Sequence, residues 1–345
     1  MNRALVDRIA DAVLYEGYIL YPYRPSVKSR QRWTFGGLYP EAWCQAQGGE
    51  SSASQTECLV RGGAAAAAVE VVVRFLHLTA RQVEEGAGPP FRPVEVLRLG
   101  DKLFQTWQEA EEREVAAGEV TLGELAARPL DWAFAFPGGR RSELLHGPGG
   151  EVVGALVREQ QPIAGAVRMV AAEVEAGLFR LTVRVENHTP LDNAERRSRD
   201  DALLSALVSA HTILGVRGGE FISLMDPPQG LRKAAAACRN VGTWPVLVGE
   251  EGRADMMLSS PIILYDYPQV APESPGDFFD GTEIDEMLTL RIMTLTDDEK
   301  RAMAAVDERA GALLARTEAM AREQLLGLHG AVRGLRPLSG EDAHG

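Results

Sequence analysis

The side chains most capable of catalysis, histidine and cysteine, are few and scattered along this chain of 345 residues. The six histidines form no HxH or HExxH pattern and the three cysteines form no CxxC pair, so no zinc-site spacing is present. His211 and Cys238 would be a base and a nucleophile if the fold brought them together. Nothing in the sequence places them in contact, and the buried core is the commoner place for both residue types. Their chemical role therefore stays open.

Acidic residues gather in the segment PESPGDFFDGTEIDE, which includes Asp277, Asp280 and Glu283. Clustered carboxylates can bind calcium or magnesium. When the segment is aligned on its glycine with an EF-hand loop, the first and third ligand positions are Gly276 and Phe278, so that motif fails. We interpret the segment as a solvated acidic loop, with Asp277, Asp280 and Glu283 as candidate metal ligands, and we predict no cofactor.

Aromatic and basic residues are concentrated in the stretch YEGYILYPYRPSVKSRQRWTFGGLYP, residues 15–40. Three interpretations are open: an edge strand whose rings anchor it to the fold, a surface for a protein partner, or a nucleic-acid platform. Tyr, Trp and Arg are the residue types enriched at the energetic centres of protein interfaces. The candidate partner-binding residues are Tyr21, Tyr23, Arg24, Lys28, Arg30, Arg32 and Trp33.

The composition is that of a soluble globular protein: 45% hydrophobic, 25% charged, with a mean hydropathy of −0.13. The formal net charge of −13 opposes general binding to nucleic acid or to an anionic membrane. No run of about 18 apolar residues is present, so we expect no membrane-spanning helix. Asp7 and Asp11 argue against a signal peptide, and the sparse, odd set of cysteines fits a reducing cytoplasm.

The expected fold class is α+β, and residues 1–190 are predicted to form a mostly antiparallel, β-sandwich-like domain. The runs IAGAVRMVAAEVE and LFRLTVRVEN, within 163–187, alternate apolar and polar side chains around a short turn, which is typical of a β-hairpin. Residues 69–78 also favour a strand, because they are rich in β-branched side chains. A short amphipathic helix is expected at 3–14, and the acidic segment 108–120 fits either a helix or a strand.

Residues 191–330 are predicted to form a smaller α+β region. Ser198 and Asp201 indicate a helix start, with the helix running to about Ala210. WPVLVG and SPIILYDY are expected to be strands. A long amphipathic helix over 297–326 is expected to end the region, either docked on its own domain or paired with another chain in a homo-oligomer. Residues 331–345 are expected to be a frayed tail.

Three phrases together resemble an uncharacterised bacterial protein family found in gene neighbourhoods of nickel–iron hydrogenases. They are GYILYPYRPSVKSRQRWTFGGLYP, NVGTWPVLVG and the long segment from LSSPIILYDYPQV to TLTDDEK, and they span much of the chain. The resemblance implies an accessory role in assembling or maturing a metalloenzyme. It supplies no catalytic residue or cofactor, and the three scattered cysteines put direct handling of nickel or iron in doubt.

The main functional hypothesis is a non-catalytic cytoplasmic accessory protein that binds a protein partner, either a hydrogenase subunit or a maturation factor. One alternative is a metal- or carboxylate-dependent hydrolase that uses Asp266, Glu273, Asp277 or Asp280, since paired carboxylates can divide acid and base roles. Another alternative is a self-assembling structural subunit. The identity of the partner, the oligomeric state and the strand order do not follow from the sequence.

Overall fold

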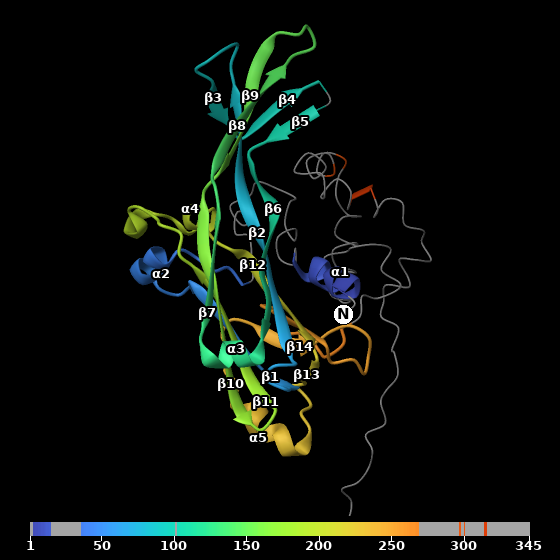
Figure 1. Ribbon diagram of the computed structural model, residues 1–345. Coiled ribbons are helices and arrows are strands. Elements are labelled where there is room, and N and C mark those ends of the chain that lie inside the picture. Colours follow the sequence, from blue (N-terminus) through green and yellow to red (C-terminus); the bar gives the residue numbers. More distant parts are fainter. Residues whose placement is uncertain are drawn as a thin grey trace, which may run out of the picture.

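The computed structural model describes residues 3–14, 36–100, 102–268 and the single positions 297, 300, 314 and 315. Two antiparallel β-sheets pack face to face, and the second sheet extends past the first into an arm (Figure 1). The predicted mostly antiparallel β architecture is therefore confirmed. No helix of the described part is long and apolar enough to cross a membrane.

The first sheet has five strands in which every neighbouring pair is antiparallel. In spatial order they are β13 (Gly219–Ile222), β1 (Ala53–Gly62), β11 (Leu178–Asn187), β10 (Ile163–Glu175) and β7 (Leu130–Phe136). The predicted hairpin at 163–187 is confirmed as β10 and β11, in which Val167 lies opposite Val185.

The second sheet is built around β2 (Ala68–Glu85), which changes its neighbour on one side partway along its length. Leu76 is paired with Val208 of β12, whereas Thr79 is already paired with Gln160 of β9. In spatial order, the main strands of this sheet are β14 (Trp244–Leu247), β15 (Met256–Ser260), β12 (Val208–Arg217), β2, β9 (Val152–Gln160) and β8 (Gly139–His146). β3 (Arg92–Val94) and β6 (Trp107–Thr121) also pair with β2, while β4 (Val96–Leu99) and β5 (Lys102–Gln105) form a separate hairpin.

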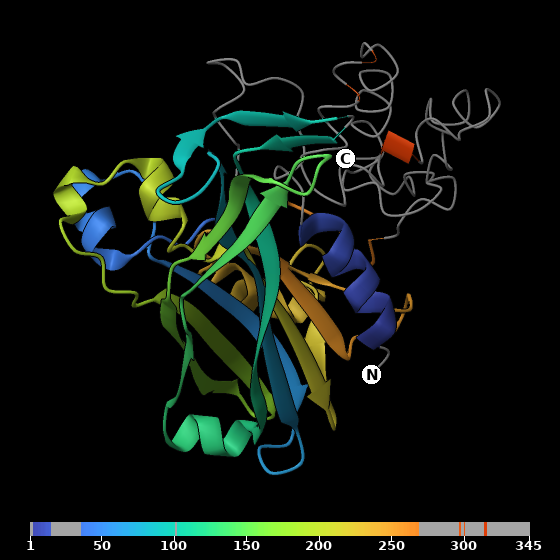
Figure 2. The same cartoon turned by 90° about the horizontal axis from the view of Figure 1, so that it is seen from above.

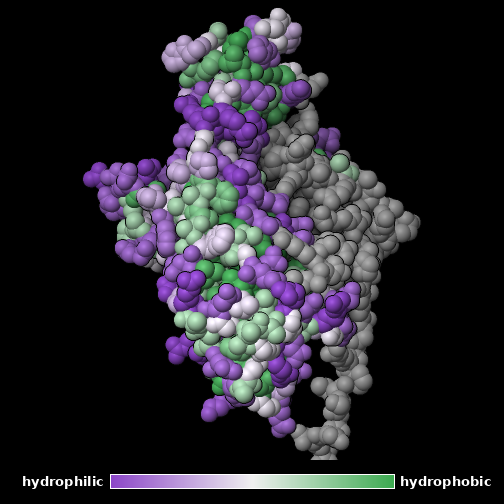
Figure 3. Space-filling view, viewed as in Figure 1, coloured by the Kyte–Doolittle hydropathy of each residue, from purple (hydrophilic) through white to green (hydrophobic). Residues whose placement is uncertain are grey.

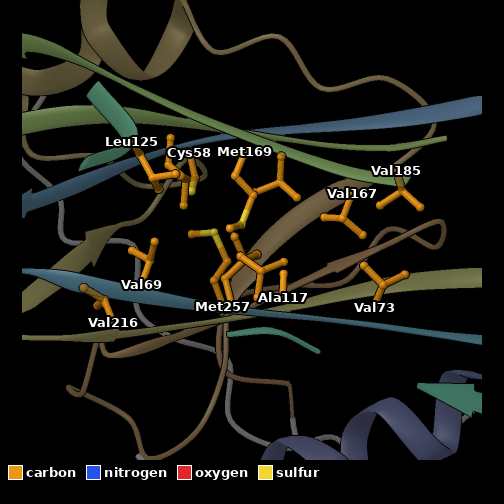
Figure 4. Close-up of a cluster of buried hydrophobic side chains, with 14 of the residues drawn as sticks. Cys58, Val69, Val73, Ala117, Leu125, Val167, Met169, Val185, Val216 and Met257 are labelled. Atoms are coloured by element: carbon orange, nitrogen blue, oxygen red, sulfur yellow. The ribbon is translucent and has the colours of Figure 1, made fainter. Parts of the chain in front are cut away.

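The core lies between the two sheets and follows the period-two alternation of the strands. Val167, Met169 and Val185 of the first sheet face Val69 and Val73 of the second (Figure 4). All of these side chains are at most 1% exposed. The apolar face read from the alternating runs is therefore the face that is buried.

Helices close the ends and one outer face of the sandwich. α1 (Arg3–Leu14) lies against the outer face of the second sheet, where Ile9 packs with Val72 and Leu258 (Figures 1 and 2). The others are short: α2 (Glu41–Gln47), α3 (Leu122–Ala127), η1 (Ala194–Arg196), α4 (Arg199–Leu203), η2 (Gln229–Leu231) and α5 (Arg232–Ala236).

The arm has a small core of its own, formed by Val83, Leu97, Leu145 and Leu156. Hydrophobic side chains gather at the end of the arm, above a band of hydrophilic residues (Figure 3). Ion pairs lie between the arm and the sandwich core: Arg81 to Glu109 at 3.0 Å, and Glu109 to Arg158 at 2.8 Å. These side chains lie where β2 runs next to β9, beyond the strands of the first sheet, so charge there does not enter the main core.

Two expectations for the second half of the chain were wrong. The helix capped by Ser198 ends at Leu203 rather than near Ala210, because β12 starts at Val208 and buries its residues in the sheet. The segment SPIILYDY was expected to be a strand, but β15 ends at its first residue, Ser260. The strand begins earlier, at Met256, directly after the polar loop.

The domain boundary predicted at residue 190 falls between β11 and η1, and strands from both sides of it belong to each of the two sheets. Of the helix expected over 297–326, only Asp297, Lys300, Leu314 and Ala315 are described, all of them helical. The rest of that helix and the tail 331–345 lie outside the described residues.

Candidate functional site

The residues predicted to bind a partner all lie outside the described part of the chain: Tyr21, Tyr23, Arg24, Lys28, Arg30, Arg32 and Trp33. The same holds for the candidate metal ligands Asp277, Asp280 and Glu283. Both sets therefore stay predictions. Among the described residues, no group of three His, Cys, Asp or Glu side chains could hold a metal ion.

Asp266 is the one carboxylate of the hydrolase alternative that the structure describes. Its carboxylate accepts hydrogen bonds from Ser223 Oγ at 2.5 Å and from the Leu247 backbone N–H at 2.8 Å. Ser223 Oγ in turn accepts the backbone N–H of Asp226 at 2.9 Å. Asp266 thus fastens the turn after β13 to the end of β14, which is a structural role.

His211 is fully buried on β12 beside a β-bulge that separates it from Val208. Its Nδ1–H donates to the Ser209 carbonyl at 2.7 Å, so Nε2 is the acceptor for the Ser260 hydroxyl at 3.1 Å. Burial lowers the pKa of His211 to about 4, so the ring is neutral at pH 7. The bonding order is that of a Ser–His dyad, but both side chains are 0% exposed, out of reach of a substrate.

Cys238 lies on the other side of the sandwich, in a small apolar cluster with Leu59 and Ile222 on the outer face of the first sheet. Its thiol donates to the Ala234 carbonyl at 3.7 Å. Burial, with a smaller effect of Glu57, raises the pKa of Cys238 to about 11, which keeps the thiol protonated. The fold therefore does not bring Cys238 and His211 together, and neither is arranged as a nucleophile.

An exposed edge is made by two consecutive strands, β7 and β8, joined by Pro137 and Gly138 (Figure 1). Among the described strands, β7 pairs only with β10 and β8 pairs only with β9. One side of each strand consequently carries no neighbouring strand of the described chain. Because β7 belongs to the first sheet and β8 to the second, the edge runs along both.

The side chains of this β7–β8 edge combine apolar surface with positive charge. Trp132 is 43% exposed and Leu144 is 48% exposed, both high values for large apolar residues. Arg140 and Arg141 are exposed and make no ion pair with any residue of the described ranges. Asp131, by contrast, lies 3.7 Å from Arg168. The edge can therefore offer backbone hydrogen bonds, apolar contact and two free guanidinium groups.

Sequence reasoning missed this edge. The signal that could have indicated it is Pro137 followed by two arginines, since proline and charge are common on edge strands.

Comparisons with known proteins return no match for this chain among family models, curated proteins or solved structures. The resemblance to a hydrogenase-associated family has no support from them and stays a prediction.

Proposed function

We propose that this chain is a non-catalytic accessory protein that binds a partner protein by accepting an extended segment of it along the β7–β8 edge. The observation that carries the proposal is the unpaired side of these two strands in the described structure. Addition of a strand to a free sheet edge is a recurring mode of protein recognition, in which main-chain hydrogen bonds supply affinity and side chains supply specificity.

Natural edge strands are commonly protected from pairing by charged side chains, proline, bulges or a covering element. On the β7–β8 edge, charge and proline are present at Asp131, Pro137 and the two arginines, and the middle of β7 carries neither. On the outer face of β7 the side chains after Asp131 are Ala133 and Ala135, both exposed and uncharged, so they place no charge beside an added strand. Pro137 interrupts the edge only at the junction between the strands.

The chemistry of the edge favours an acidic segment with apolar residues at intervals. Arg140 and Arg141 would pair with carboxylates, for which the guanidinium group offers a bidentate geometry. Trp132 and Leu144 would be covered by apolar side chains of the partner, and tryptophan is among the residues that contribute most to binding energy at interfaces. The class of partner is inferred from the sequence resemblance. It is a subunit or maturation factor of a nickel–iron hydrogenase, which this chain would bind in the cytoplasm.

Site-specific photo-crosslinking tests this proposal. A photoreactive amino acid replaces Ala133 on β7 or Ser142 on β8, both exposed, and the full chain is expressed in its native host. We expect both positions to give the same adduct, whose crosslinked peptide is extended and acidic. The same amino acid at the exposed position Lys233, on α5, should give no such adduct.

Charge reversal sharpens the test. Arg140→Glu with Arg141→Glu should reduce the adduct yield at Ser142 by at least about tenfold, the effect of losing charged hydrogen bonds. The matched control, Arg232→Glu with Lys233→Glu, should leave it unchanged. Crosslinks to a second copy of this chain would replace the proposal with self-assembly. Equal adducts at Ala133 and Lys233, or none at the edge, would end it.

A further inference from the structure

A cavity of about 550 Å³ lies on the outer face of the first sheet, away from the β7–β8 edge. It exists because of the path that the chain takes after α5. Leu231 and Ala235 pack on Leu59, and the chain then returns to β1, where Gln55 and Val241 exchange backbone hydrogen bonds of 3.0 and 2.9 Å. The residues that line the cavity are Glu57, Arg180, Ala236, Ala237 and Arg239.

Glu57 is held rigidly at the wall of this cavity. Its side chain is only 12% exposed, and its carboxylate accepts the Arg239 backbone N–H at 2.7 Å and the Thr182 hydroxyl at 3.2 Å. The backbone N–H of Glu57 also donates to Asn240 Oδ1 at 2.8 Å. The sheet and the returning segment 239–241 are thereby tied together, so the cavity wall is preorganised.

The guanidinium groups of Arg180 and Arg239 can still bind a ligand. Arg180 Nε lies 4.0 Å from the Glu57 carboxylate, which is beyond hydrogen-bonding distance, and its side chain is 35% exposed. Arg239 is exposed, and within the described ranges its guanidinium group has no ion-pair partner. With Glu57, the lining carries a formal charge of +1 in a chain whose net charge is −13.

We infer that this cavity is a binding site for a small organic anion that carries a carboxylate or phosphate group. Arginine presents planar N–H donors that match both oxyanions in a bidentate arrangement. The methyl groups of Ala236 and Ala237 supply an apolar wall for the carbon skeleton. The volume is within the range of small-molecule sites, roughly 300–1,000 Å³. Glu57, whose oxygens are already hydrogen-bonded, orients the segment 239–241. Its negative charge limits the affinity of the cavity for anions.

Calorimetric titration of the full chain with succinate and with inorganic phosphate tests this site and separates the two anion chemistries. The wild-type protein should bind at least one of them with one site per chain. Arg180→Gln and Arg239→Gln should each weaken that binding about tenfold, because a charge-assisted hydrogen bond is lost. Glu57→Gln should have the opposite effect and tighten it severalfold, since it removes a negative charge beside the anion.

Arg232→Gln is the matched control, because Arg232 is an exposed arginine of α5 that does not line the cavity. It should change the affinity by less than about twofold, as is usual for an exposed charge without a partner. Thermal melts of each variant confirm that it is folded. The inference is overturned if neither anion binds at concentrations up to about 10 mM, where affinity would be negligible. It is equally overturned if Arg232→Gln weakens binding as much as Arg239→Gln does.

Discussion

The buried imidazole of His211 makes the stability of this protein depend on pH in a way that one substitution can isolate. In the folded chain its pKa is lowered from 6.5 to about 4, chiefly by burial, with a smaller effect from the nearby Arg74 guanidinium. Arg74 is itself held by Asp11 at 2.6 Å and Glu112 at 3.1 Å. The neutral ring is fixed between the Ser209 carbonyl and the Ser260 hydroxyl.

The direction and size of the effect follow from proton linkage. Because the pKa of His211 is lower in the folded chain, the unfolded chain takes up a proton first as the pH falls below 6.5. The stability contributed by the neutral ring is therefore complete at pH 7 and is lost between pH 6.5 and about 4. At 1.36 kcal/mol per pH unit the loss is roughly 3 kcal/mol.

Urea unfolding at several pH values between 7 and 4 measures this loss. The free energy of unfolding of the wild-type chain should fall by roughly 3 kcal/mol more than that of His211→Gln, since carboxylates titrate equally in both. The control His146→Gln removes an exposed histidine of β8 and should follow the wild-type curve. Parallel curves for wild type and His211→Gln would refute the reasoning, because the imidazole would then be solvated or able to accept a proton in place.

Three further substitutions test the packing. Asn187→Leu should cost about 3 kcal/mol in urea unfolding, since the buried amide donates to two carbonyls at 2.8 and 2.9 Å and accepts one N–H at 2.9 Å. Gly218→Ala should cost about 2 kcal/mol or more in the same assay, because φ is +71° and a Cβ would lie 2.3 Å from the Ala66 carbonyl oxygen. Phe75→Ala should cost about 4 kcal/mol and lower the thermal midpoint, since the ring is 0% exposed and packs against Phe134 and Phe136.

Strands with an apolar face were the part of the fold that the sequence predicted best. Val167 and Met169 alternate with Arg168 and Val170, and that period of two belongs to a strand buried on one face. The acidic segment 108–120 was ambiguous because its glutamates favour a helix by propensity. It became β6 because Val115 and Ala117 reach the core while Glu109 pairs with Arg81 of the neighbouring strand.

The features that escaped prediction depend on contacts distant in sequence. Ser198 and Asp201 do form the expected capping box, but nothing local shows that Val208 will be drawn into the second sheet, where it pairs with Leu76. The cavity likewise needs Glu57 and Arg239, which are 182 positions apart in the chain. Spacing along the sequence carries no information about such a pair, since only the return of the chain from α5 to β1 brings it together.

The change of partner along β2 links the fold to the proposed partner-binding edge. Where β2 exchanges β12 for β9, between Leu76 and Thr79, β7 of the first sheet continues through Pro137 into β8. The same chain segment can then be an edge of both sheets, and a partner strand laid along it would contact the sandwich and the arm at once. The cavity at Glu57 lies beyond β10 and β11 from that edge, so an anion could bind there without competing with the partner. Crosslinking at Ala133 should accordingly be unaffected by Arg239→Gln, which gives the two sites independent tests.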